Sequence, residues 1–246
     1  MLNSEPYCLI MIKLISKVSL ILLLCTSTFL AKAQLGYDYA QYDVGAAIGM
    51  DYPVSTDVFK SLKTTPSAHF NFTYNQTPYV NYVFEGQFGR LKGGNEITGY
   101  GRMFENHFAA FALKVQLQAG ELIDYSQSNV TNVFKNFYLS TGIGYIVNHI
   151  VVKTPDKSLP PGFMLAGDNN SQIPFVPLRV GYEFKFFNEY NEPSVKIDLG
   201  YQYNLILDDN LDGYIAGNHN DIFSQLTIGV KFAIGGVTSY RKQISY

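Results

Sequence analysis

The sequence has no tryptophan, and its two cysteines, Cys8 and Cys25, both lie within the first 33 of 246 residues. A chain that begins after those residues contains no thiol, so disulfide bonds cannot stabilise it. Charge is also scarce, because charged residues make up 15% of the chain and the formal net charge is −2. This composition offers no basic surface for nucleic acid, and we expect no nucleic-acid partner.

Helical signals are almost missing as well. After residue 33, no stretch stays apolar over the ~20 residues that a membrane-spanning helix needs, and amphipathic helical periodicity is nearly absent. Aromatic residues are plentiful instead, at 15% of the chain, and all of them are tyrosine or phenylalanine. Tyrosine in this quantity suits a boundary between apolar and wet surroundings as well as a core.

Residues 1–33 have the pattern of a secretory signal peptide. Lysines precede an apolar run over residues 18–30, and an A-x-A motif follows it. We predict cleavage between Ala33 and Gln34, with Met11 as a candidate for the true start. A retained membrane helix is the alternative, but the apolar run is shorter than the ~20 residues of a span.

Residues 34–236 alternate between apolar and polar side chains, as β-strands do. In the stretch FVPLRVGYEFKFF, residues 175–187, every even position is apolar and the charges stand at odd positions. Many of the alternating stretches approach the roughly 9 to 11 residues that cross a bilayer at a tilt. They predict an all-β fold, an eight-stranded antiparallel up-and-down transmembrane β-barrel. The predicted strands are 42–52, 68–74, 79–89, 109–119, 137–151, 175–187, 194–207 and 222–234.

The connections between these strands alternate in length. Residues 75–78 and 188–193 are short turns, whereas four other connections are long, polar and rich in Gly, Pro, Asn and Asp. Long loops outside and short turns in the periplasm are typical of outer-membrane barrels. Segment 120–136 is a long connector on the short side, and its VTNVFKNF end predicts one helical turn. The long connectors are 53–67, 92–107, 155–174 and 208–221.

Volume indicates which face of the strands is inside. The apolar faces sum to about forty residues, mostly bulky, and an eight-stranded barrel has an interior only just wide enough for side chains. The opposite faces are rich in Gly, Ala, Ser, Asn and Gln, which would fit there. We therefore expect the bulky face to contact lipid. The same argument opposes a soluble eight-stranded carrier that holds a ligand inside, such as a lipocalin.

Charged residues share the inward face, and their signs nearly balance. We expect Glu85 to lie near Lys114, and closure of the ring to bring Asp43 near Lys231. Side chains of this length fill a narrow barrel, so we interpret them as structural fillers rather than the lining of a conducting pore. The predicted lumen network consists of Asp43, Glu85, Lys114, Arg179, Glu183, Lys185, Lys196, Asp198 and Lys231.

Diffuse motifs over nearly the whole chain suggest a family. They are AKAQ (31–34), STGIGYIVN (140–148), NLDGY (210–214) and the last strand, SQLTIGVKFAI (224–234). With these motifs the chain resembles the outer-membrane β-barrel proteins of Bacteroidota, the small OmpA-like or OmpX-like barrels. The resemblance implies location in outer-membrane lipid, both termini in the periplasm and insertion by the barrel-assembly machinery. A tail of residues 237–246 departs from this pattern and leaves open whether Phe232 or Tyr246 is the terminal aromatic signal.

A DDNLDG motif at 208–213 is the sharpest candidate for a metal site. Its Asp208, Asn210 and Asp212 place oxygen ligands at alternating positions before a glycine, as in a Ca²⁺-binding loop. The twelfth position, where such a loop has a bidentate Glu, is His219. A calcium ion in outer loop 208–221 and a solvated Asn/Asp/Gly turn are the two interpretations.

Catalytic signals are weak, and we expect no enzyme. Outer-membrane lipid A deacylases place a His and a Ser on neighbouring outward positions, and none of the four histidines has an H-x-S neighbour. His149 has the outward parity near the outer rim, where it serves either as a general base beside lipid or as a girdle residue. Loop 158–167 exposes an apolar cluster that either contacts a partner or folds over the barrel mouth.

Three functional hypotheses follow. The first is a non-enzymatic outer-membrane barrel with a filled polar lumen that stabilises the envelope, or binds a partner or surface through its outer loops. The second is an accessory subunit of a larger outer-membrane secretion or uptake complex. The third, which the sequence supports least, is a lipid-modifying barrel enzyme.

Overall fold

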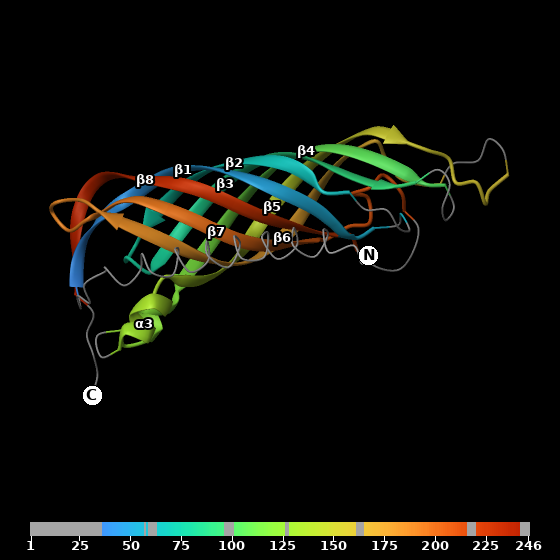
Figure 1. The fold of residues 1–246 in the computed structure, drawn as a ribbon. Coiled ribbons are helices and arrows are strands. Elements are labelled where there is room, and N and C mark those ends of the chain that lie inside the picture. Colours follow the sequence, from blue (N-terminus) through green and yellow to red (C-terminus); the bar gives the residue numbers. More distant parts are fainter. Residues whose placement is uncertain are drawn as a thin grey trace, which may run out of the picture.

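The computed structural model describes residues 36–56, 58, 63–95, 101–125, 128–160, 165–215 and 220–241. The predicted signal peptide and its cleavage pair, Ala33 and Gln34, lie outside these residues. Within the described residues, eight antiparallel strands form one closed barrel in which each strand pairs with its neighbours in sequence and β1 pairs with β8 (Figure 1). The predicted fold class, an all-β eight-stranded up-and-down barrel, is confirmed.

The described part of the chain contains two short helices and eight strands, joined by turns and loops. None of its helices is long and apolar enough to span a membrane. The strands are β1 (Gly36–Ser55), β2 (Thr65–Asn75), β3 (Val80–Gly94), β4 (Met103–Gln118), β5 (Phe137–Lys153), β6 (Asn170–Phe187), β7 (Pro193–Ile206) and β8 (Ile222–Arg241), and the helices are α2 (Ala119–Leu122) and α3 (Asn129–Phe134).

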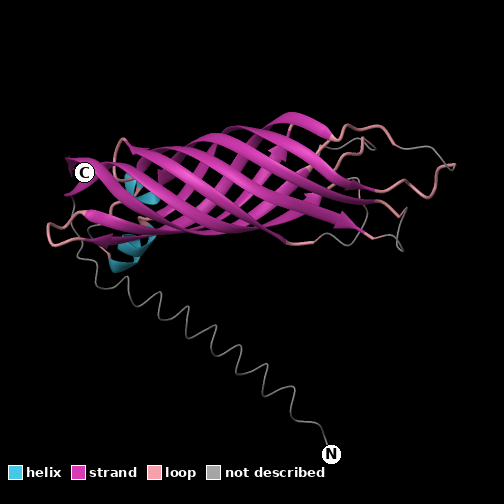
Figure 2. Cartoon of the chain, turned by 90° about the horizontal axis from the view of Figure 1, so that it is seen from above, coloured by secondary structure: helices cyan, strands magenta, loops and turns pink. Residues whose placement is uncertain are grey.

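Most strands extend further toward the long loops than the sequence predicted. β4, for example, begins at Met103, and the polar stretch from Glu105 to His107 that reads as loop stays paired with β3 and β5. Strands that project beyond an apolar belt have no reason to be apolar, so their outer ends lack the sequence signal of a strand. In Figure 2 the strands form a tilted ring with the helices at one end and the longer loops at the other.

β8 also continues past its predicted end. The Gly-Gly pair at 235–236 reads as a strand terminus, but Gly235 adopts a φ of +84° and lies at a register shift opposite Ala40 and Tyr42. A glycine with positive φ at such a shift forms a β-bulge, after which the ladder continues. Pairing resumes and reaches Arg241, so residues 237–241 belong to the barrel wall and not to a tail.

The outward face of the strands is apolar and the inward face is buried, as the volume argument predicted. Leu113 and Ile143 stand opposite each other on β4 and β5 and are 59% and 70% exposed. Their inward neighbours alternate with them, and Lys114 is only 4% exposed. An exposed apolar belt around a ring of buried charges is the inverse of a soluble protein and is the arrangement of a membrane barrel.

One expectation about the interior was wrong, because the lumen is not polar throughout. Toward the long loops, inward aromatic and aliphatic side chains form an apolar layer. Phe108 and Phe223 lie with ring centroids 5.6 Å apart, and Leu211 of the loop after β7 joins the same cluster. About half of these residues, such as Phe104 and Phe108, lie outside the predicted strand bounds, whereas others, such as Phe175 and Phe223, lie inside them on the inward face. The interior therefore has a polar middle below an apolar lid.

The opposite mouth is closed by residues 119–125 and 128–136. The predicted helical turn is confirmed as α3, whose first turn is capped by the Ser128 side chain accepting from the Val130 amide at 3.2 Å. The Tyr182 hydroxyl donates to the Val133 carbonyl at 2.8 Å and fixes α3 against β6. A cluster of tyrosines from both termini, the β2–β3 turn and this segment fills the mouth: Tyr39, Tyr79, Tyr125 and Tyr240.

Replacing Leu113 with arginine tests the outward face. We expect Leu113→Arg to lower the free energy of unfolding in phospholipid vesicles by about 2–4 kcal/mol, the cost of Arg on the lipid face near the bilayer midplane. Guanidinium titration followed by circular dichroism measures this. Glu189→Arg, in the exposed β6–β7 turn, is the matched control and should change stability by less than about 0.5 kcal/mol. Equal stability of the two variants would contradict a lipid-facing Leu113.

Candidate functional site in the barrel interior

The polar middle of the barrel contains all nine residues predicted for the lumen network. Alternation along the strands directs them inward, because every second side chain of a closed sheet points to the interior. Eight of them are less than 9% exposed, and Lys185, nearer the turn end, is half-buried. These charges would be costly to bury alone, so their partners determine what the interior can do.

Like charges lie side by side across three strands. Lys185 stands opposite Lys196, and Lys196 stands opposite Lys231. One inward position further along, Glu183 stands opposite Asp198. Opposite-sign contacts run between these two rows: Lys231 lies 2.6 Å from Glu183 and 2.9 Å from Asp198. The row of ammonium groups and the row of carboxylates thus neutralise each other's charge.

Asp43 completes the network from β1, but not with the partner that we expected. Its carboxylate lies 2.6 Å from the Lys196 ammonium, whereas Lys231 contacts the acidic row. Lys231 stands opposite Gly45, one inward position away from Asp43. The sequence places Asp43 and Lys231 on adjacent strands but not at the same height, which depends on the stagger of the closed ring.

A second part of the network joins residues of the five strands from β3 to β7. The predicted Glu85–Lys114 pair is present at 2.8 Å. Arg179 donates to Asp198 at 2.6 Å and to the Tyr138 hydroxyl at 2.7 Å.

A glycine makes room for that arginine. Gly200 lies beneath the guanidinium, and a Cβ built there would stand 2.3 Å from the Arg179 Nη2 atom. A side chain at position 200 would therefore displace the arginine from its partners.

Lys185 links this network to the closed mouth. Its ammonium donates to the Pro78 carbonyl at 2.8 Å and to the Gln118 side chain at 2.7 Å, and it lies 4.9 Å from the centre of the Tyr79 ring. Nearby, burial lowers the pKa of Lys135, which follows α3, to about 8. The turn end is therefore held by cations that contact carbonyls and tyrosine rings.

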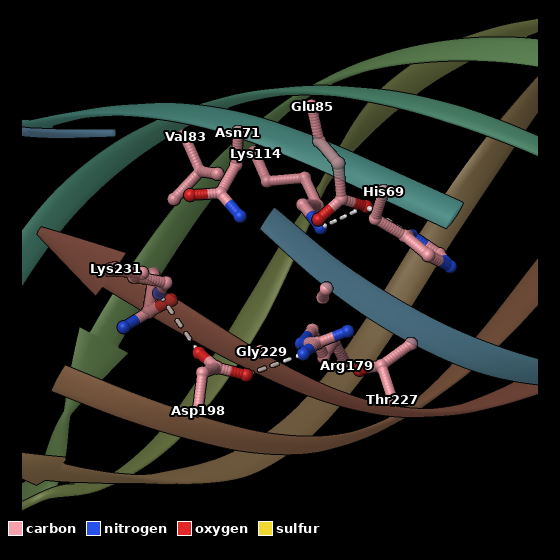
Figure 3. A pocket seen from close by; sticks show the side chains of 12 residues that line it. His69, Asn71, Val83, Glu85, Lys114, Arg179, Asp198, Thr227, Gly229 and Lys231 are labelled. Atoms are coloured by element: carbon pink, nitrogen blue, oxygen red, sulfur yellow. Dashed lines mark hydrogen bonds and ion pairs between the residues drawn. The ribbon is translucent and has the colours of Figure 1, made fainter. Parts of the chain in front are cut away.

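Very little space remains between these side chains. A cavity of about 20 Å³ lies between His69, Glu85, Lys114, Arg179 and Asp198 (Figure 3). That volume holds about one water molecule. The apolar lid lies above this cavity and the tyrosine cluster lies below it.

A buried hydrogen-bonded chain that the sequence did not predict lies beside the cavity. Ser67 donates to Asp51 at 2.7 Å, and its hydroxyl lies 3.0 Å from His69 Nε2. His69 Nδ1 in turn lies 3.7 Å from Glu85. Lipid A deacylases have the order H-x-S on the outward face, whereas these residues form S-x-H on the inward face.

This Ser–His pair is buried. Ser67 is 7% and His69 1% exposed, and the His69–Glu85 separation exceeds hydrogen-bond length. A Cβ built on Gly49 would lie 2.7 Å from the Ser67 hydroxyl, so even the neighbouring backbone leaves no room. These contacts are those of polar side chains packed in an interior, and they do not form a hydrogen-bonded catalytic triad.

The predicted calcium ligands point to different partners. The Asn210 side-chain oxygen accepts from the Asp168 amide at 3.1 Å, and Asp212 accepts from the Tyr214 amide at 2.9 Å. Asp208 is exposed and accepts from the amide of Asp209 at 2.7 Å. No group of three His, Cys, Asp or Glu side chains in the described chain is placed to hold a metal. His219 lies outside the described residues, and Ca²⁺ binding stays a prediction.

The loops at this end are tied to one another. The Tyr214 hydroxyl donates to the Thr154 carbonyl at 2.7 Å, and the Ile215 amide donates to the Ala166 carbonyl at 2.8 Å. Arg102 lies 2.7 Å from Asp156.

Burial alone would raise the pKa of Asp156, but hydrogen bonds from Ser158 and Arg102 outweigh it and hold that pKa below its ordinary value. Of the apolar cluster in loop 158–167, Leu165 folds onto the lid, whereas Phe163 and Met164 lie outside the described residues.

Comparison with known proteins finds similar solved structures at low sequence identity. No known family and no curated protein sequence matches the chain. Among solved structures, neisserial surface protein A is similar over 80% of this chain and 99% of its own, with 15% identity and a TM-score of 0.46. Ail, the attachment invasion locus protein of Yersinia pestis, is similar over 79% and 98%, with 11% identity and a TM-score of 0.40. At these identities the likeness concerns the fold alone, and the Bacteroidota assignment stays a prediction.

Breaking one ion pair tests the network. We expect Lys114→Met to lower the free energy of unfolding by about 3–5 kcal/mol, because it leaves a buried carboxylate without its partner. The double variant Glu85→Gln/Lys114→Met removes both charges and should recover most of this loss. Denaturant titration in vesicles measures both. A single variant that is no less stable than the double variant would show that the pair is not buried together.

Proposed function

We propose that the chain is a non-enzymatic outer-membrane barrel that does not conduct and that acts through its outer loops, as a surface for binding or adhesion. The observation that carries this proposal is the combination of a filled interior with a structured set of loops at one end. A barrel that only had to occupy the membrane would not need such loops. Loops on a rigid scaffold are where binding function usually lies.

The filled interior opposes transport. Two ion-paired rows, an apolar lid and a tyrosine-filled mouth leave a cavity of about 20 Å³. Long charged side chains also fill the lumen of a narrow barrel in preference to water. A role in passive uptake would require the lid, including Phe108 and Phe223, to leave the interior.

The described parts of the loops support a binding role because contacts within the chain hold them in place without a partner. Tyr214 and Leu211 are 1% and 0% exposed, and they continue the apolar lid out of the barrel into the loop after β7. A preorganised surface loses less conformational entropy on binding. Ile215 and Leu207, in the same loop, are 48% and 55% exposed and present apolar contact area.

A loop-exchange experiment tests the proposal. Cells that display the intact barrel are compared, for adherence to host-type protein and glycan surfaces, with cells whose loops 154–169 and 207–221 are replaced by short turns. We expect adherence to fall to background after the exchange, while both proteins stay in the outer-membrane fraction. Both purified proteins should also show no open-channel steps in planar bilayers. Unchanged adherence, or steady channel steps from the intact barrel, would contradict the proposal.

Limited proteolysis tests whether the loops are held together. We expect Tyr214→Ala to speed cleavage within loops 154–169 and 207–221 by about tenfold, because the lost ring and hydroxyl release the contact between them. Strand segments should remain intact. Tyr190→Ala, at an 80% exposed position in the opposite turn, is the control and should leave the outer loops as resistant as before. Equal cleavage in both variants would show that Tyr214 does not hold the loops.

A further inference from the structure

A row of polar and basic side chains crosses four strands on the outside of the barrel, just beyond the apolar belt. Arg90 on β3 stands opposite His107 on β4, His107 stands opposite His149 on β5, and His149 stands opposite Asn170 on β6. On β3 to β5 the next outward row toward the turns is apolar, with Phe88 opposite Ala109 and Ala109 opposite Val147, whereas β6 has Gln172 opposite Val147. The change from apolar to basic therefore occurs at one height on β3, β4 and β5.

More cations lie one step further toward the loops. Lys92 follows Arg90 on the outward face, and the exposed Lys63 forms a β-bridge with Lys92. One carboxylate, Glu105, serves this group: it lies 2.8 Å from Lys92 and 3.2 Å from His107. The patch thus contains three permanent cations and one carboxylate, so it has an excess of positive charge.

Arg90 is the member best placed for a ligand. It is exposed, and its side chain makes no hydrogen bond or ion pair with the described residues. His149 is oriented by Asn170, whose side-chain oxygen lies 2.6 Å from His149 Nδ1. The patch therefore combines an available guanidinium with fixed imidazole and ammonium groups.

Other described parts of the rim, on β1 and after β7, differ from this face. On β1 the outward residues near the loops are Tyr52 and Val54, which are 42% and 38% exposed, and in the loop after β7 Asp208 and Leu207 are exposed. The cations therefore gather on the β3–β5 side. A general need for solubility would place charges around the whole rim, so the one-sided placement indicates a ligand.

We propose that Lys63, Arg90 and Lys92, with His107 and His149 beside them, form a binding site for the phosphate group of a membrane lipid in the leaflet at the loop end. Guanidinium and ammonium groups bind phosphate through charge-assisted hydrogen bonds. The apolar row directly below the site accommodates acyl chains, so one lipid can contact both rows. The site rests on the proposed membrane location and adds a ligand class that the loop function does not require.

Native mass spectrometry of the detergent-folded barrel tests this site with dioleoyl phosphatidic acid as the probe and dioleoyl phosphatidylcholine as the zwitterionic reference. Near a charged surface each Lys or Arg strengthens binding to anionic lipid by about fivefold. We expect Arg90→Gln to weaken phosphatidic acid binding by about fivefold, and Lys63→Gln/Arg90→Gln/Lys92→Gln to weaken it by more than about twentyfold. Phosphatidylcholine binding should not change.

Lys157→Gln removes one charge from an exposed position in the β5–β6 loop and is the matched control, with no expected effect. Loss of binding in Lys157→Gln equal to that in Arg90→Gln, or unchanged binding in the triple variant, would overturn the site and leave the barrel function intact. Displacement of the lipid by an equal concentration of glycerol 3-phosphate would also overturn it, because the membrane-anchored source would then not matter. A barrel that takes up neither lipid would contradict the membrane location itself.

Discussion

Closure of eight strands into a ring is the constraint on which the rest of this structure depends. A closed ring leaves no free strand edge, which allows a chain without disulfide bonds in its described part to be stable in a membrane. The ring also encloses a fixed and narrow volume. Every inward position must then be filled without voids and without lone charges, and every outward position must suit the surrounding lipid.

The interior meets this constraint in layers. Tyrosines and the described residues around α2 and α3 close the turn end, ion-paired rows occupy the middle, and apolar side chains such as Phe108 fill the loop end. Glycines such as Gly200 provide the room that the large side chains need. Because the middle contains carboxylates and ammonium groups in near balance, it carries charge without requiring a counterion from solvent. The interior is therefore packed from the turn end to the loop end, and the long loops lie beyond the apolar layer.

Alternation with period two was enough to predict the strands, their inward faces and the nine lumen charges. It predicted the Glu85–Lys114 pair, but not every partner, since Asp43 contacts Lys196 and not Lys231. That contact depends on the stagger of the closed ring, which no single strand determines. Strand ends were also missed where the chain leaves the apolar belt, as at Glu105, or where Gly235 makes a bulge instead of an end. The Ser67–His69 pair is recognisable in the sequence as S-x-H. It could have been predicted by pairing residues that share the inward face of β2.

Fluorescence in vesicles of lipid with brominated acyl chains tests the central claim most directly. The chain has no tryptophan, so single substitutions report one site each. Phe111 on β4 is 47% exposed and outward, whereas Phe108 on the same strand is 5% exposed and inward. We predict that bromine strongly quenches Phe111→Trp and leaves Phe108→Trp nearly unchanged. Stronger quenching of Phe108→Trp than of Phe111→Trp, or no quenching of either, would contradict an apolar face turned to lipid around a packed interior.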